Sequence, residues 1–303
     1  MRTLMAATLG WMSLALAAPT FAVERGYGPV NGLQLYYEIH GNPAKDGVPL
    51  VLLHGGGSTI DTSFGKLIPL VSKSRQVIAF EQQGHGHTAD VDRPFSFEQS
   101  AEDAVALLRH LQVAKADFLG YSNGGHIALE IALRHPEVVR SLIVHSAFFS
   151  REGTDPRFWQ GFDHAKLEEM PLELRKAYLA TAPHPEQLPS FFAKSVQRMR
   201  EFKGWTPAQL RTIRAPTLLV LGDRDIVRVE HAAQMQHLIP DARLAVLPAT
   251  DHLAMTDRAA EVAAMLDEFL LRGVSATGIP AVERAGLAAH LRAASPRLQR
   301  TPP

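Results

Sequence analysis

The chain has 303 residues, of which 46% are apolar, so a sizeable core can form in one large domain or two small ones. Its 31 basic and 31 acidic side chains balance, which gives no electrostatic reason to expect nucleic acid or an anionic membrane as partner. The absence of cysteine excludes a thiol nucleophile, a disulfide framework and any metal site built on cysteine.

The segment 1–22 has the pattern of an export signal. Arg2 precedes an apolar run over residues 4–17, and small residues follow it. This order is typical of a secretory signal peptide. Residues 20–22 fit cleavage before Val23, with a site after Ala17 as the alternative. The run is short for a spanning helix, so we expect a secreted or periplasmic protein without stable membrane insertion once the leader is removed.

Downstream of the leader, strand-like and helix-like segments alternate. The Asn-Gly pair within residues 30–33 predicts a hairpin, because it tolerates positive φ at both central positions. Short, fully apolar runs are typical of strands buried on both faces of a parallel sheet. We predict strands at 33–39, 49–53, 76–80, 117–121 and 139–144, with helices at 97–112 and 123–134.

The alternation breaks between residues 147 and 210, where helical patterns, prolines and aromatic residues are mixed. Strand character then returns at 216–221 and 243–247, before a last amphipathic helix at 258–271. Such alternation predicts an α/β fold with a mostly parallel, doubly wound sheet. We therefore divide the chain into a core in two parts (23–146 and 211–272), a helical cap (147–210) and a C-terminal tail (273–303).

The strand at 117–121 runs directly into Gly120-Tyr121-Ser122-Asn123-Gly124, and a helix follows. A G-x-S-x-G sequence at a strand-to-helix junction is the signature of a nucleophile elbow. The turn is sharp and strained, so bulky neighbours would clash where the glycines stand. We predict Ser122 as the nucleophile, and a tight turn with an idle serine is the alternative.

A glycine-rich loop, His54-Gly55-Gly56-Gly57, follows an earlier strand. In hydrolases with a nucleophile elbow, one oxyanion donor comes from such a loop and another from the residue after the nucleophile. We predict the backbone N–H groups of Gly56 (or Gly57) and Asn123 in this role. A phosphate-binding loop is the alternative, but neither of its usual continuations follows.

Two later strand ends offer an acid and a base, in the order expected after a nucleophilic serine. Asp223 and Asp225 follow the strand at 216–221, and His252 follows the strand at 243–247. Open α/β sheets place their sites at these carboxyl ends. We predict His252 as the base that takes the proton of Ser122. Asp225 is preferred to Asp223 as the acid, because it lies further past the strand end.

Together these motifs resemble the α/β-hydrolase superfamily over residues 26–272. The resemblance implies a sheet of about eight strands with a helical cap after the sixth, and it supports Asp225, since relatives carry the acid at the end of a G-x-x-D stretch. The chain departs from the pattern where relatives usually carry Asp and Arg, at Glu81 and Gln83, and at His126, where most have a small or apolar residue. The resemblance rests on residues 54–56, 81–88, 120–125, 222–225 and 251–252.

A triad with an oxyanion hole transfers an acyl group to water through an acyl-enzyme. We expect a carboxylesterase- or lactonase-like serine hydrolase acting on a small ester or lactone. C–C bond hydrolases, amidases and cofactor-free haloperoxidases with the same triad are alternatives, as is a non-catalytic ligand-binding protein of this fold. The superfamily's dehalogenases and epoxide hydrolases use an aspartate nucleophile, so Ser122 argues against them.

The small-molecule substrate is expected to contact Gly57, Tyr121 and three cap aromatics, Phe148, Phe149 and Trp159, which predict an apolar pocket. The alternative for the aromatics is that they form the core of the cap itself.

No cofactor is expected. His85, His87, His126 and His145 do not have the spacing of a zinc signature, so we predict no metal site. A monomer is the default expectation.

Overall fold

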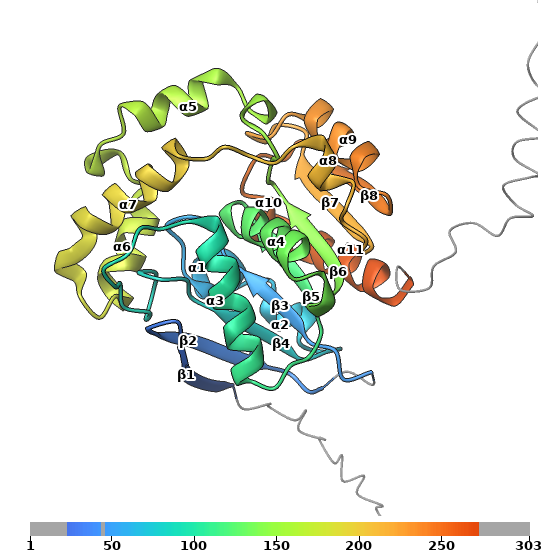
Figure 1. Ribbon diagram of the computed structural model, residues 1–303, viewed down its shortest axis with the longest axis horizontal. Coiled ribbons are helices and arrows are strands. Elements are labelled where there is room, and N and C mark those ends of the chain that lie inside the picture. The colour runs from blue at the N-terminus through green and yellow to red at the C-terminus, as the bar shows by residue number, and fades with distance from the viewer. Residues whose placement is uncertain (1–22, 44–45, 273–303) are drawn as a thin grey trace, which may run out of the picture.

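The computed structural model describes residues 23–43 and 46–272. The predicted leader and the predicted C-terminal tail lie outside these described residues. Within them, eight strands form one sheet in the order β1-β2-β4-β3-β5-β6-β7-β8. Figure 1 shows this sheet at the centre of the molecule with helices packed around it. The fold is the mostly parallel α/β sheet that the sequence predicts.

Two antiparallel strands precede the parallel part of the sheet. The turn between them has positive φ at Asn31 (48°) and Gly32 (84°), as the Asn-Gly pair predicts. Strand β2 also pairs antiparallel with β4. Along the rest of the sheet, in the order β4-β3-β5-β6-β7-β8, every neighbouring pair is parallel. The strands are β1 (Glu24–Val30), β2 (Leu33–His40), β3 (Leu50–Leu53), β4 (Val77–Phe80), β5 (Ala116–Tyr121), β6 (Val139–His145), β7 (Thr217–Gly222) and β8 (Ala242–Leu247).

The core lies on both faces of the sheet. Strands β3, β4, β5 and β7 are buried along their whole length, because their apolar side chains point alternately into two hydrophobic clusters. One cluster includes α3 (Phe97–His110), α4 (Asn123–Arg134) and α9 (Val229–Leu238). The other includes α1 (Ile60–Phe64), α2 (Ile68–Val71), α10 (Ala254–Asp257) and α11 (Ala259–Arg272).

The segment between β6 and β7 is helical, which is where the resemblance places a cap. Figure 1 shows α5, α6 and α7 as an arc beside the core. Its helices are α5 (Pro156–Asp163), α6 (Leu172–Thr181), α7 (Leu188–Arg200) and the short α8 (Pro207–Leu210). None of the helices in the described part of the chain is long and apolar enough to cross a bilayer.

Candidate active site

Ser122 stands on a strained turn between β5 and α4. Its φ of 54° and ψ of −118° lie where few residues other than glycine are found. A Cβ on Gly124 would come within 1.9 Å of the Leu53 carbonyl oxygen, and a Cβ on Gly120 within 2.1 Å of the Gly124 carbonyl oxygen. Only glycine fits at both positions, so the turn packs against β3 and holds Ser122 beyond the end of the sheet.

The structure brings Ser122, His252 and Asp225 together from the ends of three strands. Ser122 Oγ lies 3.0 Å from His252 Nε2, and His252 Nδ1 lies 2.8 Å from Asp225 Oδ1. Asp223, the competing acid, accepts instead from the backbone N–H of Thr250 at 3.0 Å. Asp225 therefore has the geometry of a carboxylate that orients the histidine, while Asp223 joins the loops after β7 and β8.

The Asp225 side chain is fully buried, whereas His252 is 24% exposed. Burial on its own would raise the pKa of Asp225. Hydrogen bonds from His252 and Ser146, together with the charge of His252, outweigh burial and hold the pKa of Asp225 below its ordinary value. The carboxylate is consequently ionised at neutral pH and accepts hydrogen bonds through both oxygens.

Tyr121 supports His252 and does not line the cavity at Ser122. Its hydroxyl donates to the His252 carbonyl oxygen at 2.8 Å, and its ring is 5.4 Å from the His252 ring. Burial, followed by the charge of Asp225, raises the pKa of the Tyr121 hydroxyl. That Tyr121 contacts substrate stays a prediction, since the structure places its hydroxyl on the His252 backbone and the residue outside the cavity lining.

The glycine loop lies against the elbow, where Gly56 adjoins Asn123. A Cβ on Gly56 would lie 2.3 Å from Asn123 Nδ2, and both residues line the same cavity as Ser122. The backbone N–H of Gly57 donates to His85 Nε2 at 3.3 Å. Burial lowers the pKa of His85 well below its ordinary value, so the ring is neutral and can accept this bond. The Gly57 N–H is thus engaged by His85, whereas the N–H of Gly56, which adjoins Asn123, does not make that hydrogen bond.

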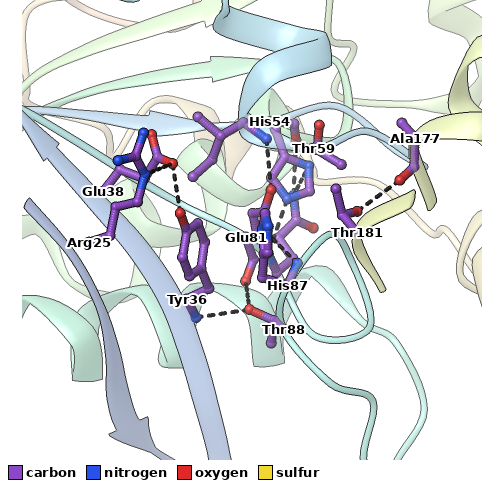
Figure 2. Close-up of polar contacts among 12 residues, drawn as sticks. Arg25, Tyr36, Glu38, His54, Thr59, Glu81, His87, Thr88, Ala177 and Thr181 are labelled. Carbon is purple, nitrogen blue, oxygen red and sulfur yellow. Dashed lines mark hydrogen bonds and ion pairs between the residues drawn. The ribbon is translucent and has the colours of Figure 1, made fainter. Parts of the chain in front are cut away.

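Glu81 occupies a position where the related family usually has aspartate, and it ties the adjoining loop to α1. Its carboxylate accepts from the His87 backbone N–H at 2.6 Å, from His87 Nδ1 at 2.8 Å and from the Ile60 N–H at 3.2 Å. Figure 2 shows His87 and Thr88 gathered around Glu81. A Cβ on Gly86, whose φ is 53°, would lie 2.1 Å from the Glu81 carboxylate. The longer glutamate therefore depends on glycine at this position.

Gln83 replaces the usual arginine and keeps a polar network in place. Its side-chain oxygen accepts from Arg93 Nε at 2.5 Å, and its nitrogen donates to Asp90 at 2.7 Å. Both departures from the family pattern are thus accommodated by hydrogen bonds within the loops beside the site.

A cavity of about 520 Å³ opens at Ser122 and His252 between the core and the cap. Gly57 lines it as predicted, and most of the remaining wall is apolar. The apolar wall comes from α5 (Phe158, Phe162), from the segment leading into α6 and α6 itself (Met170, Leu174), from α7 (Phe191, Phe192, Val196, Met199) and from Ile226.

The three cap aromatics predicted to contact substrate do not line this cavity. Phe148 and Phe149 are 2% and 4% exposed and belong to the core, where Phe149 stacks on His231. Trp159 stacks on Phe202 and lies against the Arg151 guanidinium. Phe148 and Phe149 thus pack in the main core cluster with Trp159 against it, rather than in a separate core of the cap. Phe158 and Phe162, four residues apart on one face of α5, line the cavity instead.

The four histidines weighed as a metal cluster are dispersed. Within residues 23–43 and 46–272, no group of three or more His, Asp or Glu side chains is placed to hold a metal ion. His126, unusual for the family, lies among the rings of Phe97, Phe148 and Phe202, and its burial lowers its pKa to about 3. It is a neutral core residue.

The alpha/beta hydrolase family model matches residues 50–265. The chain therefore belongs to this family and is an enzyme of the α/β-hydrolase fold.

Several relatives named as hydrolases are similar along most of the chain. Serine hydrolase BPHL of Homo sapiens is 29% identical over 259 residues, covering 80% of this chain and 84% of the relative. The 2-hydroxymuconate semialdehyde hydrolase of Pseudomonas sp. (strain CF600) is 28% identical over 246 residues, covering 74% and 87%.

Two solved structures share the fold at 21% identity. A meta-cleavage product hydrolase from Pseudomonas fluorescens superposes with a TM-score of 0.70, covering 82% of this chain and 98% of its own. An enol-lactonase from Burkholderia xenovorans superposes with a TM-score of 0.65, covering 81% and 99%.

Proposed function

We propose that the protein is a serine hydrolase that cleaves a small ester or lactone through an acyl-enzyme. The observation that carries this proposal is the chain of hydrogen bonds from Ser122 through His252 to Asp225 at the mouth of an apolar cavity. A serine hydroxyl hydrogen-bonded to an imidazole that a buried carboxylate orients is the arrangement that activates serine toward a carbonyl carbon.

Under this proposal Ser122 Oγ attacks the carbonyl carbon while His252 Nε2 takes the hydroxyl proton. Asp225 stabilises the imidazolium that forms. The oxyanion accepts hydrogen bonds from the N–H groups of Gly56 and Asn123. His252 then donates its proton to the leaving alkoxide, and water attacks the acyl-enzyme by the same route in reverse.

The cavity wall supports a substrate with an apolar acyl or alkyl part. Its volume lies within the range of small-molecule sites. The names of similar proteins span lactone and meta-cleavage product hydrolysis, so C–C bond cleavage by the same three residues is the second candidate.

The test is hydrolysis by purified protein of p-nitrophenyl esters of increasing acyl length, aliphatic lactones and a meta-cleavage product dienoate. Ser122→Ala is expected to lower ester hydrolysis by at least about 10³-fold. Ser141→Ala is the matched control, because Ser141 is also buried but pairs with Asp117 near the start of β5, whereas Ser122 follows the end of that strand. Activity that survives Ser122→Ala contradicts the proposal.

Two further outcomes identify the alternatives. Turnover of the dienoate without turnover of esters or lactones supports the C–C hydrolase. A protein that neither turns over the panel nor reacts with a fluorophosphonate supports the ligand-binding alternative.

A further inference from the structure

A second hydroxyl lies behind the proposed triad. Ser146 directly follows β6, at the same end of the sheet as Ser122, and is 2% exposed. Its Oγ is 2.5 Å from Asp225 Oδ2, the carboxylate oxygen opposite the one that meets His252. The same Oγ is 2.9 Å from His145 Nδ1. The hydrogen bonds therefore continue past Asp225 to two residues that the proposed reaction does not use.

The positions of the protons follow from the chemistry of the groups. An ionised carboxylate only accepts, so the Ser146 hydroxyl must donate to Asp225. The Ser146 oxygen then accepts from His145, which must carry its proton on Nδ1. His145 is completely buried, and burial lowers its pKa to about 4, so the ring is neutral. Its ring also packs against Tyr121 at 5.6 Å, which holds the imidazole in place.

The backbone conformation at Ser146 is one that glycine adopts more easily than serine. Its φ is 55°, a left-handed conformation that glycine adopts without strain. The Ser146 N–H donates to the Val220 carbonyl oxygen at 2.8 Å, so β7 fixes this conformation. Strained residues of this kind persist only where the surrounding structure holds them, and they gather at functional sites. Here the side chain contacts the proposed catalytic acid.

We propose that Ser146 is a positioning residue for Asp225 and that His145 acts through it by fixing the direction of the Ser146 hydroxyl. This inference rests on the proposed function. The Val227 N–H also donates to Oδ1 at 3.3 Å, but Ser146 is the donor on Oδ2. Donors on both oxygens prevent the carboxylate from rotating, which keeps Oδ1 aligned with His252 Nδ1. Ser146 touches no reacting atom, so its loss weakens orientation and leaves substrate binding intact.

The chain offers a matched control on the same strand. Ser141 Oγ donates to the buried carboxylate of Asp117 at 2.6 Å, in the first half of β6, whereas Ser146 follows the last residue of that strand. Ser146→Ala and Ser141→Ala each remove one buried hydroxyl from a carboxylate. Ser146→Gly also removes the hydroxyl but relieves the left-handed strain, so a folded variant is available if the alanine form is unstable.

The experiment measures kcat and KM for the preferred ester and the rate at which a fluorophosphonate labels Ser122. We expect Ser146→Ala and Ser146→Gly to lower kcat and the labelling rate about 10- to 100-fold, with KM changed less than about twofold. Ser141→Ala is expected to retain the wild-type values.

A double-mutant cycle tests the role of His145. His145→Phe, which lacks the Nδ1 donor, is expected to lower kcat a few-fold in the wild-type background and to have no further effect in Ser146→Ala. The inference is overturned if both Ser146 variants match Ser141→Ala in kcat, or if His145→Phe is equally harmful in the two backgrounds. Activity that survives Ser122→Ala would instead overturn the proposed function.

Discussion

Asp223 and Asp225 follow the same strand two residues apart, but their hydrogen-bond partners differ. Asp225→Asn is expected to lower kcat by about 10³–10⁴-fold, because an amide stabilises neither the correct tautomer nor the imidazolium. Asp223→Asn keeps a side-chain oxygen that can accept from the Thr250 backbone N–H and is expected to retain kcat within about tenfold. Steady-state kinetics of the two variants provide the test, and equal losses would contradict the assignment.

His85 is a second residue whose effect is indirect. It accepts the Gly57 N–H, and its own Nδ1 donates to the Gln83 carbonyl oxygen at 2.9 Å. His85→Phe removes the acceptor, so the glycine loop shifts and kcat is expected to fall about tenfold, less than the loss of a whole oxyanion donor. His85→Gln keeps a polar acceptor and is expected to fall less. An unchanged kcat in His85→Phe would show that the bond does not hold the loop.

The meeting of single residues was predictable where a motif combines a residue type with a strand end. Ser122, His252 and Asp225 lie within hydrogen-bonding distance of one another in that order, because parallel strands bring their carboxyl ends to one edge. Ser146 follows a strand too, but a lone serine there carries no distinctive pattern. The 2.5 Å distance from Ser146 Oγ to Asp225 Oδ2 depends on the register in which β6 pairs with β7. The sequence alone does not determine that register.

At the scale of elements, the elbow depends on backbone packing against β3. Gly124→Ala would place a methyl group 1.9 Å from the Leu53 carbonyl oxygen, and neither backbone can move without disrupting the sheet. We expect lower thermal stability and loss of activity. Gly161 in α5 is the control for stability, since a Cβ there meets nothing within 4 Å and alanine favours a helix. If Gly124→Ala is as stable as Gly161→Ala, the packing argument is wrong.

Strands and core helices were predictable because their apolar patterns report burial, and the Asn31-Gly32 turn because its chemistry is local. The cap was predictable only as a helical insertion. Whether Phe158 or Trp159 meets the cavity depends on how α5 is rotated about its axis. That rotation is set by contacts with Phe148 and Phe202, which lie outside the helix.

At the scale of the whole molecule, buried histidines make stability depend on pH. Burial lowers the pKa of His54, His145 and His231 to about 4 and that of His126 to about 3, and it lowers the pKa of His85 as well. The unfolded chain therefore binds more protons as the pH falls. Above about pH 6.5 the protonation of these buried histidines costs the folded state nothing. As the pH falls from there toward their pKa values in the folded state, the free energy of unfolding decreases by about 1.4 kcal/mol per pH unit for each histidine.

Urea unfolding at about pH 7.5 and about pH 5 measures this dependence. We expect much lower stability at the acidic pH. His126→Leu, which removes one buried titrating group among aromatic rings, should reduce the difference, whereas His164→Gln on the exposed surface should not. Equal stability at both pH values would contradict the description of these histidines as buried neutral groups.

The proposed reaction depends on Ser122 as the nucleophile, activated by His252. The most direct measurement is mass spectrometry of the protein after reaction with a fluorophosphonate, comparing wild type with Ser122→Ala and His252→Ala. We predict one adduct on the peptide that contains Ser122, no adduct in Ser122→Ala and slow labelling in His252→Ala. An adduct on another residue, or hydrolysis without any adduct on Ser122, would contradict the account.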